Sequence, residues 1–394
     1  MKTRHVITLA LAVAVLAAAC GAESESATTM PEPDESTTTV PPSTTAPAAT
    51  GELVRAEVPR DTTTDVGDDE IAALVAGNTE FAFDIFRTVA GKDNTMLSPN
   101  SIATALTMTY AGARATTAEQ MAATLHLSLL EDRIHAARNE LDLRITAEPQ
   151  LPPDDDSQPF TINTANSVWG QPDYPFLEEF LEILARDYDA GMYLADFAND
   201  SEGARTAIND WVEEETEGRI KDLIPPGVLT PLTRMVLVNA IWFKANWMHQ
   251  FQPDLTAPGP FTRFDGSTVT ADLMHGNITI PWSTGDGYAA VAIPYAGDAD
   301  MVVVLPDEGR FGDVVASFGP DQLAAIATNS ERRAVDLTMP KFEFEAEFGL
   351  KGALTSLGMV EAFVAPPGPG TADFTGITEG QELYVQDVVH KSFI

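Results

Sequence analysis

Apolar residues recur at helical spacing through the first half of the chain. Phe81, Ile85 and Val89 stand four residues apart, which places them on one face of a helix. In the segment SPNSIATALTMTYAGA, Ser98 is suited to cap a helix whose first turn opens with Pro99, because the N–H that proline lacks has no intrahelical partner there. The pattern therefore predicts a helix that starts at Pro99.

Shorter helical signals follow. Thr117 followed by Gln120, or Thr116 followed by Glu119, has the sequence of a capping box for a short helix that ends near residue 125. Further apolar spacing predicts helices around residues 177–184 and 208–212. A late helix is predicted at 350–357, with Gly358 placed to end it.

Strands are predicted in the second half. The segment MVLVNAIWF, from Met235 to Phe243, is almost continuously apolar apart from Asn239, as is typical of a strand buried on both faces. In VDLTMPKFEFEA the apolar residues change phase across Pro340, and a bend or bulge at the proline would keep both sets facing the core. Helices first and strands later, without regular alternation, predict a mixed α+β fold.

The chain ends in an apolar run rather than a polar tail. Leu383 to Ile394, LYVQDVVHKSFI, is rich in β-branched residues and has no turn residue or cap behind it. Because a terminus usually frays into solvent, we expect the sequence to be incomplete and the structure to continue beyond Ile394.

The amino terminus has the pattern of a secretion signal. Lys2 and Arg4 precede an apolar run from Val6 to Ala19, which suits the core of a signal peptide and is short for a membrane span. The run ends as LAAAC, which resembles a bacterial lipobox at Cys20, the single cysteine. We expect cleavage after residue 19 and a lipid on Cys20 that holds the protein on the outer face of the cell membrane. The alternative is ordinary cleavage and free secretion, and an unmodified Cys20 in mass spectrometry would support it.

Composition separates a linker from a folded domain. Residues 20–70 are rich in Thr, Ser, Pro, Ala and acidic residues, so they cannot bury enough surface to offset the entropy lost on ordering. We expect a flexible linker there and one domain at 71–394. The whole chain has 23 basic and 59 acidic residues and a net charge of −36. Because such a chain repels nucleic acid and anionic surfaces, we expect no nucleic-acid partner and no membrane contact except through the lipid.

Eight segments of the predicted domain resemble the serpin family in order and spacing. They are SPNSIATALTMTYAGARATTAEQM, INTANSVWG, INDWVEEETEGRIKDLIPPG, TRMVLVNAIWFKANWMHQF, YAAVAIPY, MVVVLPDE, ADFTGI and LYVQDVVHKSFI. The resemblance covers Ile71 to Ile394, and agreement of this many segments in one order is implausible by accident. It implies an α+β serpin fold of several helices around three β-sheets, with a large central sheet.

The resemblance also implies a protease inhibitor rather than an enzyme. A serpin exposes a reactive loop near its carboxyl end, and after cleavage the first half of the loop enters the large sheet as a new strand and traps the acyl-enzyme. The expected partner is a serine protease, or a cysteine protease as for some members of the family. We expect the inhibitor to be a monomer and to need no cofactor. The reactive loop, its scissile bond and the last strands of the other sheets would then lie beyond Ile394. The alternative is a non-inhibitory binding protein on the same scaffold, which bulky, charged or proline residues after Ile394 would favour.

The resemblance assigns roles to individual residues. The polar cluster beneath the main sheet, called the shutter, is matched by Ser98, Ser101, Asn239 and His390. An asparagine in an apolar strand and a histidine near the final strand need hydrogen-bond partners if they are buried. Trp247 matches the aromatic of the breach, where insertion begins, and Lys341 resembles a lysine that pairs with an acidic residue at the base of the reactive loop.

Simpler interpretations stand beside these. Ser98 and His390 could be a nucleophile and its base, but no GxSxG elbow surrounds Ser98, so a structural serine is favoured. Taken alone, Trp247 would be an ordinary aromatic and Lys341 a solvated strand lysine. Four other histidines lack the spacing of metal ligands, so no metal site is expected; they are His126, His135, His249 and His275. The segment from residue 130 to 144 mixes charges, so no heparin-type polyanion is expected as a partner.

Overall fold

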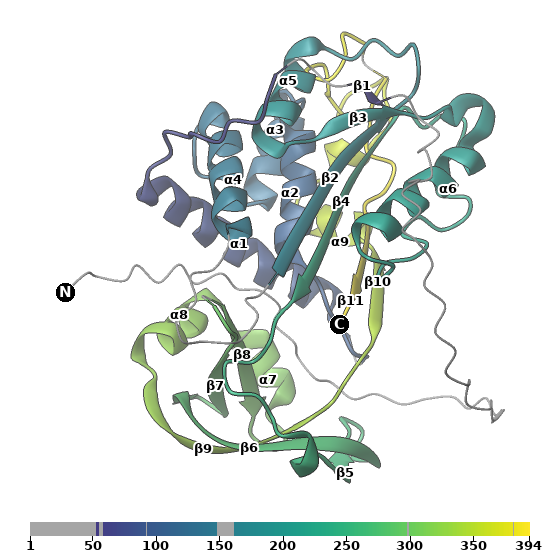
Figure 1. The fold of residues 1–394 in the computed structure, drawn as a ribbon. Coiled ribbons are helices and arrows are strands. Elements are labelled where there is room, and N and C mark those ends of the chain that lie inside the picture. Colours follow the sequence, from purple (N-terminus) through teal and green to yellow (C-terminus); the bar gives the residue numbers. More distant parts are fainter. Residues whose placement is uncertain (1–52, 55–57, 92, 148–160, 298, 381) are drawn as a thin grey trace, which may run out of the picture.

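The computed structural model of this chain describes residues 53–54, 58–91, 93–147, 161–297, 299–380 and 382–394 (Figure 1). The signal segment, Cys20 and most of the predicted linker lie outside these residues, and so do the side chains at 161–165 and 239–242. The α+β class predicted from the apolar pattern is confirmed, because helices fill the first half and strands most of the second.

The helices are α1 (Asp68–Val89), α2 (Pro99–Tyr110), α3 (Ala115–Thr124), α4 (Glu131–Thr146), α5 (Glu178–Tyr188), α6 (Phe197–Glu215), α7 (Phe311–Ser317), α8 (Pro320–Asn329) and α9 (Lys351–Ser356). Helices α1 to α5 and α9 pack together, α6 lies apart from them, and α7 and α8 lie at the lower end of the molecule in the view of Figure 1. As predicted, α2 begins at Pro99 directly after Ser98, but the Ser98 side chain makes no capping hydrogen bond, because its hydroxyl is paired with that of Ser101. Gly358 follows α9 with a φ of +111°, a conformation that glycine adopts without steric cost.

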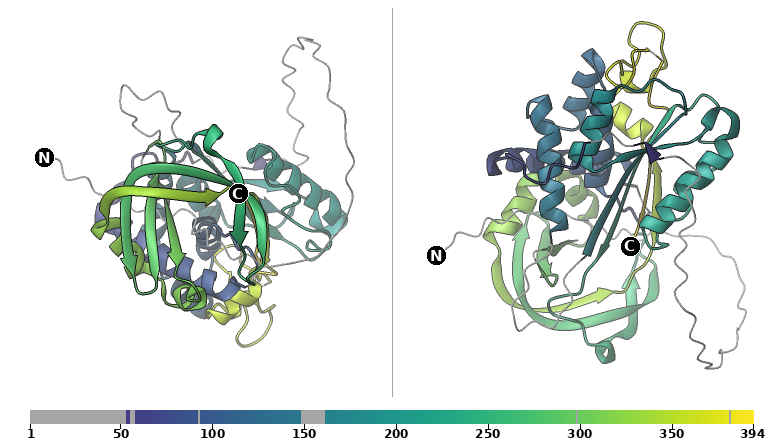
Figure 2. Two further views of the ribbon diagram at one scale, coloured as in Figure 1. Left: turned by 90° about the horizontal axis from the view of Figure 1, so that it is seen from below. Right: turned by 45° about the horizontal axis from the view of Figure 1, so that its top comes forward.

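The described strands form three sheets. The strands of the first, in order of pairing, are β1 (Leu53–Val54), β3 (Gly191–Leu194), β2 (Thr161–Gly170) and β4 (Met235–Lys244). The second contains β10 (Glu345–Gly349) and β11 (Val389–Phe393). The third contains β5 (Ala257–Thr262), β6 (Thr268–Gly285), β7 (Tyr288–Pro294) and β8 (Asp300–Pro306) in that order, with β9 (Glu331–Pro340) paired to β6. Figure 2 shows this third sheet from below, as a curved layer across one end of the molecule.

Helices cover both faces of the first sheet. On one face, Val168 of β2 and Leu237 of β4 join the apolar cluster built around α2. On the other face, Trp169 and Val238 join the apolar side chains of α6. Successive residues of a strand point to opposite faces, so residues 235–238 of β4 pack against helices on both faces of the sheet, with Val238 fully buried and the other three partly buried.

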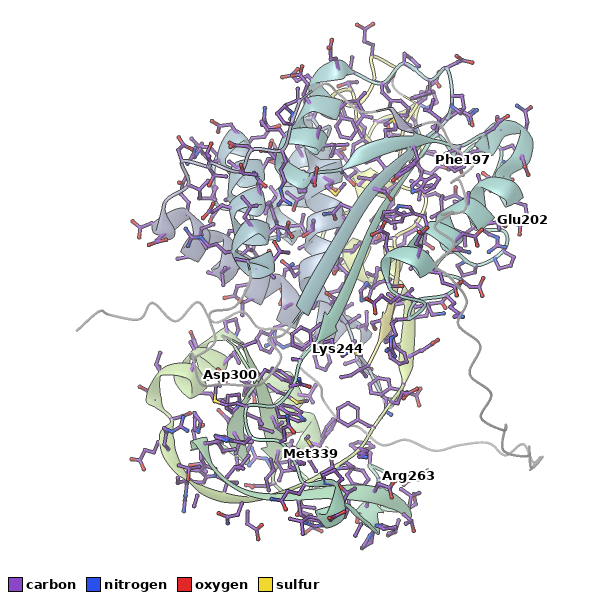
Figure 3. All side chains as sticks on the ribbon, viewed as in Figure 1. Phe197, Glu202, Lys244, Arg263, Asp300 and Met339 are labelled. Carbon is purple, nitrogen blue, oxygen red and sulfur yellow. The ribbon has the colours of Figure 1, made fainter. Side chains whose placement is uncertain are left out.

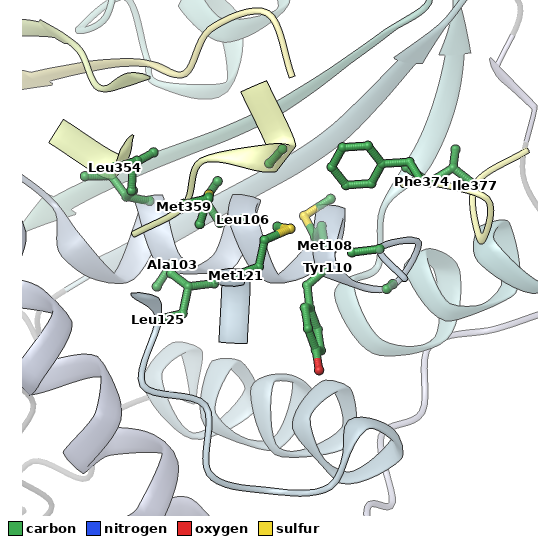
Figure 4. Close-up of a cluster of buried hydrophobic side chains, with 14 of the residues drawn as sticks. Ala103, Leu106, Met108, Tyr110, Met121, Leu125, Leu354, Met359, Phe374 and Ile377 are labelled. Atoms are coloured by element: carbon green, nitrogen blue, oxygen red, sulfur yellow. The ribbon is translucent and has the colours of Figure 1, made fainter. Parts of the chain in front are cut away.

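Helix α2 runs through the main core. Ala103, Leu106 and Met108 are almost fully buried and meet side chains from α3 and from the segment after α9 (Figure 4). The helix therefore forms a fixed floor beneath the first sheet.

The phase change across Pro340 marks a change of sheet. β9 ends at Pro340 and pairs with β6, whereas β10 begins at Glu345 and pairs with β11. The prediction of one bent strand was wrong, because each half pairs with a segment that is distant in sequence, and local alternation does not reveal such pairings.

The predicted capping box was also wrong. Helix α3 begins at Ala115 without a side-chain cap. The hydroxyl of Thr117 instead accepts the Asp373 N–H at 3.0 Å. The side-chain oxygen of Gln120 accepts the N–H groups of Val360 and Glu361 at 2.9 and 2.8 Å. These side chains hold the chain after α9 against α3.

The folded part begins before residue 71. Helix α1 starts at Asp68, and the Arg60 side chain bonds to Asn139 and Asp142 of α4. The predicted end of the linker at residue 70 was therefore too late. Composition alone missed this boundary because these contacts are made by polar side chains rather than by buried apolar ones.

Candidate functional site

A gap separates β4 from β11. β4 pairs with β2 along one edge and β11 pairs with β10 along one edge, and among the described strands neither has a partner along its other edge. Between them lies a cavity of about 200 Å³, lined by α2, by the start of β4 and by the segment that leads into β11. We call this cavity the groove.

β4 and β11 run in the same direction. The groove is lined by the first residues of both strands, among them Met235 and Val389. A second cavity, of about 520 Å³, is lined by Trp247, which follows β4, and by Ile394, which follows β11. In Figure 3, Lys244 marks this end of β4 next to the third sheet. A strand that returned from Ile394 between β4 and β11 would thus be antiparallel to both, the arrangement that a tight turn permits.

Three of the four predicted shutter residues meet at the floor of the groove. The backbone N–H of Ser98 donates a 3.0 Å hydrogen bond to Nε2 of His390. The hydroxyls of Ser98 and Ser101 are 2.8 Å apart. His390 is 9% exposed and Ser101 is 4% exposed, and burial lowers the pKa of His390 to about 4. The imidazole is therefore neutral at pH 7, and it links β11 to the start of α2.

Asn239 lies in β4, opposite Asn166 of β2 in the strand register. It follows Val238, which lines the groove together with Ser101 and His390. The Asn239 side chain is outside the described atoms, so its place in the shutter stays a prediction.

The hydrogen bonds of Ser98 differ from those of a catalytic serine. His390 accepts from the backbone N–H of Ser98, whereas the Ser98 hydroxyl is paired with that of Ser101. A general base must reach the hydroxyl proton of its nucleophile. This geometry supports the structural interpretation of Ser98.

Further polar contacts hold β11 in place. The buried hydroxyl of Ser392 donates to the Met96 carbonyl at 2.9 Å. The Lys391 ammonium donates to the Lys221 carbonyl at 2.7 Å and lies 3.4 Å from Glu345. Gln386 Nε2 donates to the Val228 carbonyl at 3.3 Å. The loop after α6 is therefore fastened to the β11 side of the groove, although α6 itself packs on the first sheet.

Sequence reasoning did not assign roles to Ser392 and Lys391. The available signal was the alternation in VHKSF, which puts Ser392 on the same side of the strand as His390. Lys391 gave no local signal, because its partner carbonyl belongs to a loop far away in the sequence.

The predicted breach residues line the second cavity together. The Trp247 ring stacks on Tyr295 with centroids 4.5 Å apart and an interplanar angle of 13°, and it meets Phe251 edge to face at 6.1 Å. Burial raises the pKa of Tyr295 to about 12. Lys341 is exposed at the same cavity, and its backbone N–H donates to the Asp272 carbonyl at 2.8 Å. The cavity is thus mainly apolar and aromatic, with one cationic and one acidic residue, Lys341 and Glu343, in its lining.

The described ranges contain no group of three or more His, Cys, Asp or Glu residues arranged to hold a metal ion. None of the helices described is both long and apolar enough to cross a membrane.

Comparisons with known proteins agree with this architecture. The family model described as Serpin (serine protease inhibitor) matches residues 76–394. A serpin-like protein of Thermococcus kodakarensis is 37% identical over 323 residues, which cover 82% of this chain and 72% of that protein. The leukocyte elastase inhibitor of Sus scrofa is 32% identical over 338 residues, covering 82% of this chain and 85% of the inhibitor. Ovalbumin from emu, Dromaius novaehollandiae, has a similar structure with a TM-score of 0.75 and 27% identity, over 82% of this chain and 85% of that chain.

Proposed function

This chain is a member of the serpin family, and from that premise we propose that it inhibits serine proteases by inserting a reactive loop into the groove as an additional strand. The groove between β4 and β11 is the observation that carries the proposal. Both strands face the groove with edges that have no partner strand in the described chain, and such an edge binds an incoming strand through its free N–H and C=O groups.

The direction of the strands supports insertion from the end at Ile394. The loop of a serpin follows the strand that corresponds to β11, so its first residues would turn back at the cavity beside Trp247. A strand entering there can bond to β4 on one side and to β11 on the other. Because the entering strand would be antiparallel to both neighbours, a short turn after Ile394 is sufficient.

The target protease supplies the chemistry of the proposed reaction. Its serine oxygen attacks the carbonyl carbon of the scissile peptide bond, the C–N bond breaks, and the new amine leaves with a proton from the protease's own histidine. An ester then joins the loop to the protease. Insertion would carry the bound protease away before water hydrolyses that ester. This chain contributes the groove and the contacts that control its width.

The shutter and the loop after α6 would control the width of the groove. Widening the groove separates β4 from β11, and Ser98 and His390 tie β11 to α2 below it. The Lys391 contact with the Lys221 carbonyl crosses to the side of α6. A strand can enter only when such bonds are exchanged for new ones, which makes insertion slow until cleavage frees the loop.

The test uses the full-length protein, with any residues encoded beyond Ile394, mixed with a panel of serine and cysteine proteases. We expect a complex that survives denaturing electrophoresis and contains one inhibitor and one protease. A matched protease whose nucleophilic serine is replaced by alanine should give no such complex. Cleavage of the loop without a stable complex would sink the proposal and favour a non-inhibitory binding protein on the same scaffold.

A further inference from the structure

The segment from Arg60 to Glu70 lies across α4 and is fastened along its length. Arg60 Nε donates to the side-chain oxygen of Asn139 at 2.9 Å, and Arg60 Nη2 contacts a carboxylate oxygen of Asp142 at 2.6 Å. Further along, Arg133 of α4 contacts Asp65 and Glu70, each at 2.7 Å. We call residues 60–70 the strap.

The strap completes the hydrogen bonding of a buried side chain. Asn139 is 0% exposed. Its amide oxygen accepts from Arg60, and its amide nitrogen donates to the Asp61 carbonyl at 2.6 Å. The N–H of Asp61 in turn donates to the Arg186 carbonyl of α5 at 3.0 Å. A buried amide without hydrogen-bond partners costs folding free energy. Detaching the strap would therefore destabilise the packing of α4 against α5.

The same stretch of chain reaches the outer edge of the first sheet. β1 precedes the strap and pairs with β3 in antiparallel register, Leu53 opposite Tyr193 and Val54 opposite Met192. Figure 1 shows the strap running past α5 and α4 to the start of α1. β1, β3, β2 and β4 form one continuous set of paired strands. The strap therefore connects the helices to the sheet whose opposite edge borders the groove.

We propose that the strap restrains the movement of β4 away from β11 and so controls how readily the groove widens. A hydrogen-bonded sheet moves as a unit, and a shift of β4 away from the groove carries β3 and β1 with it. The strap resists this shift because it is anchored to α4 at Arg60 and to α5 at Asp61. The inference rests on the proposed function only in taking widening of the groove as the controlled step.

Hydrogen exchange measured by mass spectrometry on the full chain tests the strap directly. In the Arg60→Gln variant we expect amides of residues 235–244 and 389–393 to exchange roughly fivefold faster, as for the loss of one hydrogen bond of ordinary net strength. Exchange of the β6 and β9 amides should not change. Arg60→Lys keeps the charge but cannot reach both Asn139 and Asp142. Its exchange rates should therefore lie between those of the unmodified protein and those of Arg60→Gln.

Arg310→Gln is the matched control. Arg310 also contacts a carboxylate, Asp313 at 2.9 Å, but it lies at α7, away from the groove. Its loss should leave the exchange of β4 and β11 unchanged. Faster exchange in Arg60→Gln confined to residues 58–70 and α4 would overturn the proposal, as would an equal effect of Arg310→Gln. Exchange requires no protease, so a protein that fails to inhibit can still confirm the strap, and an inhibitor can still refute it.

Discussion

The groove and the second cavity are held by different kinds of contact. At the shutter, Ser98, Ser101 and His390 are joined by directional hydrogen bonds in a buried setting. At the breach, Trp247 and Tyr295 stack beside a larger cavity with an exposed lysine at its rim. A hydrogen bond weakens steeply when its geometry is lost, whereas aromatic contacts tolerate several arrangements.

This difference indicates a division of roles. The breach can deform by small steps because stacked rings slide at modest cost, so it suits the site where a strand first enters. The shutter is either bonded or broken, and a broken buried bond leaves polar groups without partners. Under the proposed function, the shutter would set most of the barrier to strand insertion, and the two regions should respond differently to pH and to mutation.

Acid gives the largest expected effect. Burial lowers the pKa values of both His390 and His135 to about 4, below the ordinary value near 6.5, so the unfolded chain binds protons that the folded chain does not. Stability is then at its full value above pH 6.5 and falls as the pH drops toward 4, by about 3 kcal/mol for each histidine. Urea unfolding measured from pH 7 to pH 4 checks this loss.

Substitution of each buried histidine shows which residue causes the loss of stability in acid. His390→Asn should remove about half of the stability loss below pH 6.5, and His135→Gln should remove the other half. A pH profile unaffected by His390→Asn would contradict a buried shutter histidine.

His390→Ala should have the next largest effect at pH 7. It removes the acceptor of the Ser98 N–H and leaves a small void, so we expect a loss of about 2–3 kcal/mol and more oligomers on warming. The urea midpoint and the monomer fraction in size-exclusion chromatography measure both. An unchanged midpoint together with an unchanged monomer fraction would show that His390 does not hold the sheet.

Trp247→Ala tests the other side of the comparison. The ring is only half-buried, so its loss should cost about 2 kcal/mol, measured as the shift of the urea midpoint. Its acid-induced loss of stability should match that of the unmodified protein, because both buried histidines remain. A changed pH profile would mean that the breach and the shutter are not independent.

Lys341→Ala should have the smallest effect. The side chain is exposed, and surface ion pairs contribute at most about 1 kcal/mol. We expect a shift of the urea midpoint within this limit at low and at high salt. A larger, salt-sensitive loss would show that Lys341 is held in a tight ion pair.

Elements with strong local signals could be predicted from the sequence. Ser98 followed by Pro99 marked the start of α2, and the apolar run at Met235 marked β4. The shutter and breach were predicted from a family resemblance. The structure brings Ser98, Ser101 and His390 together, and their role in sheet opening stays a prediction. The role of Asn239 stays a prediction.

The features that were missed depend on distant partners. Lys391 bonds to a carbonyl of the loop after α6, and Gln120 bonds to the N–H groups of Val360 and Glu361. The two halves around Pro340 join different sheets. Local periodicity shows which face of an element is apolar, but it does not show which remote backbone group a side chain will meet.

The unfilled groove has a consequence for the lifetime of the protein. In the described chain, two strands face each other across the groove without pairing, so an arrangement with one more strand would make additional backbone hydrogen bonds. Under the proposed function, the fold would persist because that rearrangement is slow rather than because its free energy is lowest, and its durability would be a rate. The apparent melting temperature should depend on how fast the sample is heated. A segment of a neighbouring molecule could also fill the groove. The rate at which the monomer is lost on storage would then rise with protein concentration.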